Sequence, residues 1–184
     1  MAGLLAGRVA LVTGGCRGLG AAIAREYASA GATGSVVDLE AGQAPAGWAA
    51  LTADVTDENA VAAAAAATVE RFGRLDVVVA NAGVVPPWRE TGELDLGELD
   101  RVFAVNVRGV AATLKHGLAE LRRQERAGSI VVMASLNSWR AHPSQPAYTA
   151  SKHAVLGLLR TAALDAGRDG IRVNGLAPGP IATD

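Results

Sequence analysis

The chain has 184 residues and a mass of 18.6 kDa, which fits one domain because domains mostly run to ~100–200 residues. Hydrophobic residues make up 50% and charged residues 19%, so the chain can build a core and its composition excludes disorder. Seventeen basic and eighteen acidic residues give a net charge of −1, which provides no field for nucleic acid or an anionic membrane. We therefore predict a single domain over residues 1–184 with no nucleic-acid partner.

Cysteine and histidine usage argues against disulfides and metal sites. The single cysteine, Cys16, has no partner in the chain, and the three histidines lack the paired spacing of metal ligands. No apolar run approaches the ~18 residues of a membrane span, and the N-terminus lacks a basic region followed by a long apolar stretch. We expect no metal, no membrane partner and a cytoplasmic location.

Short β-branched runs alternate with longer alanine- and leucine-rich segments, the pattern of a parallel sheet with helices on both faces. In chain order, strands are predicted over Arg8–Thr13, Ser35–Asp38, Ala49–Thr52, Leu75–Ala80, Ser129–Ala134 and Ile171–Leu176. Helices are predicted over Gly18–Ala30, Asp57–Phe72, Leu96–Arg126 and Ala147–Asp169, with Asp57 as an N-cap. Glycine and proline between Asp38 and Asp54 limit any helix there to two turns. The pattern predicts a doubly wound α/β fold.

A glycine-rich segment, Thr13–Gly20, follows the first predicted strand and opens the first predicted helix. Glycines let the backbone turn tightly and approach a pyrophosphate, which free N–H groups and the positive end of the helix dipole then hold. Asp38, eighteen residues past Gly20, ends the second predicted strand, where a carboxylate can accept both ribose hydroxyls. A glycine cluster alone also fits a flexible surface loop, but this context favours dinucleotide binding.

Two residues bear on which dinucleotide binds. Asp38 repels a 2′-phosphate and favours NAD, whereas Arg17, beside the glycine turn, can neutralise that phosphate and favour NADP. The strand end places the charge of Asp38 close to the 2′ position, while an exposed arginine can swing into solvent. We predict NAD, with NADP as the alternative.

Tyr148 and Lys152 lie four residues apart on a predicted helix, so both side chains project from one face. At an effective dielectric of about 20, an ammonium about 4 Å away favours the ionised phenol by about 4 kcal/mol. Tyr148 can then take a proton from an alcohol, or return one to a carbonyl, near neutral pH. The spacing also fits an ordinary surface pair, but Ser135 follows a predicted strand and can donate a hydrogen bond to a developing alkoxide.

These motifs, in this order, resemble the short-chain dehydrogenases/reductases from about Arg8 to Asp184. The glycine segment resembles the family's Thr-Gly-x-x-x-Gly-x-Gly loop, and Ser135 stands at the family's usual thirteen residues before Tyr148. The resemblance implies a Rossmann-like sheet of six strands in the order 3-2-1-4-5-6. The cofactor-binding residues that it implies are Thr13, Gly14, Arg17, Gly18, Leu19, Gly20, Asp38, Asp54, Val55, Asn81, Ala82, Gly83, Tyr148, Lys152, Pro178, Gly179, Ile181 and Thr183.

Several of these residues belong to named segments of the family pattern. Asp54-Val55 resembles the pair that contacts adenine, and Asn81-Ala82-Gly83 matches the signature after the fourth strand. Pro178-Gly179 and Thr183 resemble the stretch that touches the nicotinamide. Single members also have purely structural interpretations, because Asn81 can tie strands together and Thr13 can satisfy backbone groups near the turn.

The resemblance implies hydride transfer at the nicotinamide C4, with Tyr148 as the acid/base and Ser135 polarising the substrate oxygen. Lys152 would bind the ribose and support the phenolate, and the backbone carbonyl of Asn106 would hold a water in a proton relay, although Asn106 can also be a simple buried polar residue. Ser138 is a weaker rival or auxiliary hydroxyl. Residues that can line the substrate side, or can be loop residues only, are Trp88, Trp139 and His142.

The chain departs from the family pattern by stopping at Asp184, before a substrate lid, a further helix and a seventh strand. We therefore expect a C-terminally short member whose sixth strand is an unpaired edge. A homo-oligomer, dimer or tetramer, is expected to be weakened by the missing pieces.

The leading functional hypothesis is an NAD-dependent oxidoreductase that interconverts a secondary alcohol and a ketone as small-molecule substrates. One alternative is an NADP-dependent ketone reductase of the 3-oxoacyl type. The other is a non-catalytic dinucleotide-binding protein, which the short C-terminus motivates.

Overall fold

The computed structural model describes residues 3–40 and 42–182, in which six parallel strands form one sheet. The strand order is β3-β2-β1-β4-β5-β6, which confirms the predicted Rossmann-like order. The strands are β1 (Val9–Thr13), β2 (Thr33–Asp38), β3 (Ala49–Thr52), β4 (Val77–Ala80), β5 (Ser129–Met133) and β6 (Arg172–Leu176). In the described sheet β3 and β6 are the two edge strands.

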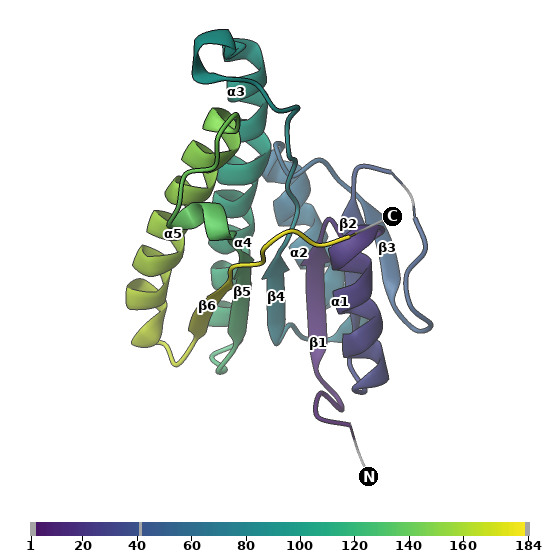
Figure 1. The fold of residues 1–184 in the computed structure, drawn as a ribbon. Coiled ribbons are helices and arrows are strands. Elements are labelled where there is room, and N and C mark those ends of the chain that lie inside the picture. The colour runs from purple at the N-terminus through teal and green to yellow at the C-terminus, as the bar shows by residue number, and fades with distance from the viewer. Residues whose placement is uncertain (1–2, 41, 183–184) are drawn as a thin grey trace.

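Helices cover both faces of the sheet, with α1 in front of it in Figure 1 and α2, α4 and α5 sharing one core cluster on the other face. The helices are α1 (Gly18–Ser29), α2 (Glu58–Phe72), α3 (Leu96–Phe103), α4 (Val110–Arg123) and α5 (Pro146–Gly167). Because both faces of the central strands are covered, every residue of β1 is buried, which explains its continuous apolar run. None of the helices in the described part is long and apolar enough to cross a membrane.

Small side chains let the helices approach the sheet closely. In α4, a Cβ built on Gly117 would lie 3.1 Å from Cγ2 and 3.2 Å from Cγ1 of Val78 in β4. The alanine run of α2 packs in the same way, with Ala64 and Ala65 buried in the main core cluster. The alanine-rich composition is thus the composition of helices that lie tightly on a sheet.

The ends of α2 follow local signals. The carboxylate of Asp57 accepts hydrogen bonds from the N–H groups of Asn59 and Ala60, as the predicted N-cap should. Gly73 ends the helix at a φ of 77°, where its N–H donates to the carbonyl of Val69. The connection between β2 and β3 forms no helix in its described residues, 39–40 and 42–48.

The predicted single helix over Leu96–Arg126 is wrong in two respects. A π-helical turn over Ala104–Gly109 separates α3 from α4, and α4 ends at Arg123. The side chain of Asn106, within the turn, bonds to the backbone of Val84 and to Ser151. Such turns often occur at functional sites, and this one lies beneath the site described below.

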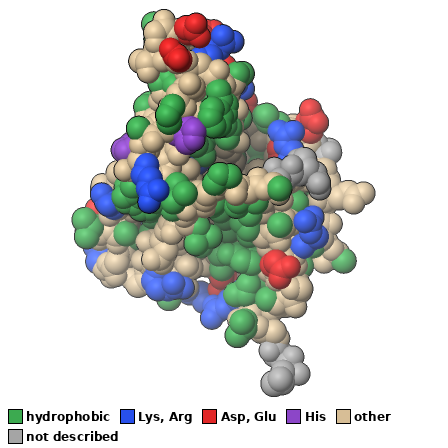
Figure 2. Space-filling model, in the orientation of Figure 1, with side chains coloured by type: hydrophobic (Ala, Val, Ile, Leu, Met, Phe, Trp, Pro, Cys, Tyr) green, Lys and Arg blue, Asp and Glu red, His purple; other side chains and the backbone are tan. Residues whose placement is uncertain are grey.

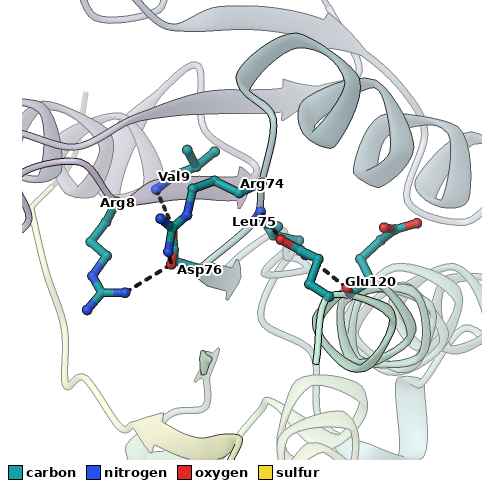
Figure 3. A network of polar contacts seen from close by, with 7 residues as sticks. Arg8, Val9, Arg74, Leu75, Asp76 and Glu120 are labelled. Carbon is teal, nitrogen blue, oxygen red and sulfur yellow. Dashed lines mark hydrogen bonds and ion pairs between the residues drawn. The ribbon is translucent and has the colours of Figure 1, made fainter. Parts of the chain in front are cut away.

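The amino ends of the strands are tied together by one buried carboxylate (Figure 3). Asp76 accepts hydrogen bonds from Arg8, Arg74 and the N–H of Val9, and its backbone carbonyl accepts from the N–H of Ser129. Burial raises the pKa of the Asp76 carboxyl, but the hydrogen bonds from Arg74, Val9 and Arg8 outweigh it and hold the pKa below its usual value. The Asp76 carboxylate thereby joins the starts of β1 and β4, and its backbone carbonyl adds the start of β5.

Asp76→Asn should lower the free energy of unfolding at pH 7 by about 3 kcal/mol, because it leaves Arg74 without its charged partner. Glu58→Gln is the matched control: its ion pairs are more exposed, so it should lower the free energy of unfolding clearly less than Asp76→Asn does. Since the native pKa of Asp76 is lowered, the advantage of the wild type should be present above about pH 4 and shrink as pH falls further. Urea unfolding of the three proteins measures this, and equal losses in both variants would contradict it.

Candidate active site

A groove of about 420 Å³ lies at the carboxyl ends of the strands, where open α/β sheets bind ligands. The predicted site residues that line it are Gly14, Arg17, Gly18, Leu19, Gly20, Asp38, Asp54, Val55, Asn81, Ala82, Gly83, Ser135, Tyr148, Lys152, Pro178, Gly179 and Ile181. Thr13 and Asn106 are buried beside the groove rather than lining it, and Thr183 lies outside the described residues. Segments far apart in the sequence thus meet at one groove.

The glycine turn forms the wall on the α1 side. Gly14 and Gly18 have positive φ values of 62° and 52°, which favour glycine. A Cβ built on Gly20 would lie 2.0 Å from the carbonyl oxygen of Gly14, so the helix can start this close to β1 only without a side chain there. No described side chain caps α1, and its first turn holds no acidic residue. Its first N–H groups are therefore suited to a pyrophosphate.

Thr13 and Asn81 brace the turn from below. The Thr13 hydroxyl donates to the carbonyl of Val79 and accepts from the N–H groups of Asn81 and Ala82. The Asn81 amide donates to the carbonyls of Thr13 and Gly14, at 2.9 and 3.0 Å. Asn81 therefore joins the ends of β1 and β4 while it also faces the groove.

Asp38 and Arg17 both line the groove, so the two residues that bear on cofactor choice are present together. The Asp38 carboxylate accepts from the N–H of Cys16 at 3.1 Å and from the N–H of Leu39 at 2.9 Å. Each oxygen uses one backbone donor, and a carboxylate has about four acceptor positions. Asp38 is thus held in place and can still accept two hydroxyl groups.

Tyr148 and Lys152 lie in the first turns of α5, and both face the groove as their spacing predicts. Lys152 is 4% exposed, and its ammonium donates to the carbonyl of Met133 at 2.8 Å. The same nitrogen lies 5.7 Å from the centre of the Tyr148 ring. Burial lowers the pKa of Lys152 to about 8, so the amine is still mainly protonated at pH 7.

Ser135 follows β5 and starts a short 3-10 turn. Its hydroxyl oxygen accepts from the N–H of Asn137, and its own N–H donates to the hydroxyl of Ser138. No described group accepts the hydroxyl proton of Ser135, which can therefore be donated to a ligand oxygen. Ser138 is buried within the cap and does not line the groove, so the structure gives the rival hydroxyl a local structural role.

Asn106 is fully buried beneath the groove. Its side chain accepts from the N–H of Val84 at 2.8 Å and donates to the Val84 carbonyl at 2.9 Å and to the Ser151 hydroxyl at 3.2 Å. A Cβ built on Gly83 would lie 3.3 Å from Oδ1 of Asn106 and 3.9 Å from Nζ of Lys152. The Asn106 side chain therefore holds the β4 wall of the groove against α5.

Sequence reasoning missed the apolar part of the lining. These residues are Val37, Leu39, Ala53, Val84, Val85, Val105, Met133 and Ala134. Most of them adjoin a predicted site residue at a strand end, which was the available signal. Trp88 and His142 contact each other edge to face, with ring centres 4.6 Å apart, but neither they nor Trp139 line the groove among the described residues.

Residues 8–184 match the family model described as short chain dehydrogenase. The chain belongs to this family. Short-chain dehydrogenase reductase 5 of Arabidopsis thaliana is 44% identical over 187 residues, which cover 97% of this chain and 72% of that protein. Levodione reductase of Leifsonia aquatica is 40% identical over 96% of this chain and 70% of its own length.

Solved structures agree with this assignment. The crystal structure of a levodione reductase has a TM-score of 0.92 and 39% identity, and covers 97% of this chain and 74% of its own. NAD+-bound xylitol dehydrogenase has a TM-score of 0.92 and 31% identity, over 96% of this chain and 71% of its own. As a short-chain dehydrogenase, the chain is an oxidoreductase that acts on CH–OH groups of small molecules with a nicotinamide dinucleotide.

The lowered pKa of Lys152 predicts a specific pH dependence of stability. Between about pH 8 and pH 10.5 the unfolded chain holds the lysine proton and the folded chain does not, so folding becomes more favourable as pH rises. The unfolding free energy of the wild type, relative to Lys152→Met, should rise by about 3 kcal/mol over this range and stay level below it.

Urea unfolding of the cofactor-free proteins at several pH values measures this difference. Lys115→Met is the control, because the Lys115 side chain is 67% exposed. The difference in unfolding free energy between the wild type and Lys115→Met should show no comparable rise with pH. A level difference between the wild type and Lys152→Met up to pH 10.5 would contradict the prediction.

Proposed function

We propose that this chain is an NAD-dependent oxidoreductase that interconverts a secondary alcohol and a ketone, with Tyr148 as the general acid/base. The observation that carries the proposal is the arrangement of three groups at one end of the groove. No group in the described residues accepts the hydroxyl proton of Ser135, Tyr148 lines the same groove, and the ammonium of Lys152 is buried beside it. A glycine turn suited to a pyrophosphate forms the other end.

The residues present fit a nicotinamide dinucleotide. The backbone is so tightly packed at Gly14 and Gly20 that a side chain would clash there, so the turn stays accessible to a pyrophosphate. The Asp54-Val55 segment offers a wall for the adenine. Lys152 uses one proton on Met133, which leaves two donors for ribose hydroxyls. When bound, the dinucleotide accepts a hydride from the alcohol or supplies one to the ketone.

The protein's own residues handle the proton and the oxygen. In alcohol oxidation Ser135 donates a hydrogen bond to the substrate oxygen, which becomes more negative as its proton leaves. Tyr148 accepts that proton, and the ammonium of Lys152 stabilises the phenolate that can accept it. In ketone reduction Tyr148 returns the proton to the carbonyl oxygen while Ser135 polarises it. Asn106 supports this arrangement by fixing the β4 wall and Ser151 against α5.

NAD is favoured over NADP by the way Asp38 is held. Two backbone N–H groups fix its carboxylate at the end of β2, so its charge stays where a 2′-phosphate would bind. Arg17 is exposed and free to point into solvent. The NAD+-bound state of the similar xylitol dehydrogenase is consistent with this choice.

The distribution of charge along the groove favours an uncharged substrate. Among the described lining residues, charges other than that of Lys152 lie at the end formed by β1, β2 and β3, on Arg17, Asp38 and Asp54. Ala134 adjoins Ser135, and the described lining also includes the apolar Val84, Val85 and Ile181. Levodione reductase and (+)-borneol dehydrogenase 2 of Salvia officinalis, both 40% identical, carry names of alcohol and ketone chemistry.

A cytoplasmic location and a homo-oligomeric state of the protein stay predictions.

Tyr148→Phe should lower kcat at least about a hundredfold while the Kd for NAD stays within about threefold, because the phenol moves a proton but does not carry the pyrophosphate. Initial rates over a panel of uncharged secondary alcohols and ketones, with NAD binding by calorimetry, measure both effects. Unchanged turnover in the variant would refute the assigned chemistry. Cofactor binding without turnover in the wild type would instead support the non-catalytic alternative.

NAD should stabilise the wild type against heat more than NADP at equal concentrations, since a ligand at a hundredfold its Kd adds about 2.7 kcal/mol. Asp38→Ser should narrow or reverse this order, because it removes the charge that repels a 2′-phosphate while Arg17 remains. Differential scanning calorimetry with each cofactor measures the order. Greater protection of the wild type by NADP would favour the NADP-dependent reductase instead.

A further inference from the structure

Gly109, the last residue of the π-helical turn, lies directly behind the groove wall at Val55. Gly109 is buried, and a Cβ built on it would lie 2.8 Å from Cγ2 and 3.1 Å from Cβ of Val55. Side chains do not approach as closely as the 2.8 Å contact with Cγ2, whereas the 3.1 Å contact with Cβ is tight but can be relieved by a small shift. A side chain at position 109 would therefore have to displace Val55.

Val55 has little room to move away from the groove. It packs in a small cluster with Val61 and Ala112, which are 2% and 6% exposed. The turn that carries Val55 is held by a hydrogen bond from the N–H of Asp57 to the carbonyl of Asp54. Close packing leaves few voids in such a cluster, so the open side is the groove that Val55 lines.

We propose that Gly109 is a positioning residue for the dinucleotide, because its missing side chain keeps Val55 out of the space for the adenosine half. The inference rests on the proposed binding of adenosine against Asp54 and Val55. It differs from the role of Asn106, which holds the β4 wall on the other side of the same turn. The π turn thereby supports two walls of the groove through two different residues.

The sheet topology separates the strand that leads to Val55 from the helix that carries Tyr148. β3, which precedes Val55, is the sheet edge opposite β6, and α5 with Tyr148 packs beside β6 (Figure 1). A displacement of Val55 should therefore weaken binding of the adenosine half and leave the proton transfer intact. This predicts a change in Kd with little change in kcat.

Gly109→Ala is the direct test, and Gly117→Ala is its matched control. Gly117 is buried in the adjoining helix, where a Cβ would lie 3.1 Å from Val78, a core residue outside the groove lining. Gly109→Ala should raise the Kd for NAD and for ADP-ribose about tenfold or more, with kcat at saturating NAD within about twofold. Gly117→Ala should leave both Kd values within about twofold, although it also crowds the fold.

A second substitution tests whether the effect acts through Val55. Val55→Ala removes Cγ2, so Gly109→Ala added to that background should change the Kd for NAD by less than about threefold. A double variant that binds NAD about tenfold more weakly than Val55→Ala alone would overturn the proposal. This comparison also decides the matter if Gly109→Ala alone does not fold.

Calorimetry with NAD and ADP-ribose separates the possible failures. A wild type that binds neither NAD nor NADP would overturn the proposed function and this inference together, before any variant is compared. A wild type that binds, with a folded Gly109→Ala that binds equally well, would overturn this inference alone. Equal losses of affinity in Gly109→Ala and Gly117→Ala would also overturn it, because crowding anywhere along the π turn and α4 would then suffice.

Discussion

The buried ammonium of Lys152 is the interaction on which the candidate site depends. A cation in an apolar interior is costly, and here one backbone carbonyl, that of Met133, is its described hydrogen-bond partner. The packing that keeps it there comes from both neighbouring elements, because β5 ends at Met133 and α5 buries Leu156 and Leu159 in the main core. The fold therefore retains a charge that destabilises it. The group beside this charge is Tyr148, whose phenolate the ammonium can stabilise.

The two ends of the sheet are held together by different interactions. At the amino ends Asp76 collects two arginines and a backbone N–H, which closes that end with a network of ions. At the carboxyl ends Thr13, Asn81 and Asn106 bond to backbone groups and fix the loops in place. Figure 2 shows hydrophobic side chains gathered in the middle of the viewed face, with most charged ones around its margin. Polar side chains thus fix the loops around the groove, whereas an ionic network closes the opposite end of the sheet.

Periodicity and composition were sufficient for most of the fold. The buried strands contain continuous apolar runs, and the glycine turn, Asp57 and Gly73 mark helix ends by local chemistry that needs no tertiary partner. The π turn could not be predicted in this way, because it coincides with side-chain bonds from Asn106 to Val84 and Ser151, which are distant in sequence. A local sequence pattern indicates the secondary structure that one segment prefers. It does not show which distant segment will form hydrogen bonds with it.

The difference between local sequence patterns and contacts with distant segments also explains which parts of the site could be predicted. Polar residues at strand ends stood out, whereas Val84 and Val85 look like core residues until the groove beside them is known. The partner of Lys152 is a backbone carbonyl, which has no sequence signal at all. Gly109 lies inside the single helix that the sequence predicts over Leu96–Arg126, where glycine costs about 1 kcal/mol relative to alanine. A buried helical glycine in an alanine-rich chain therefore indicates a close neighbour, and here that neighbour is the groove wall.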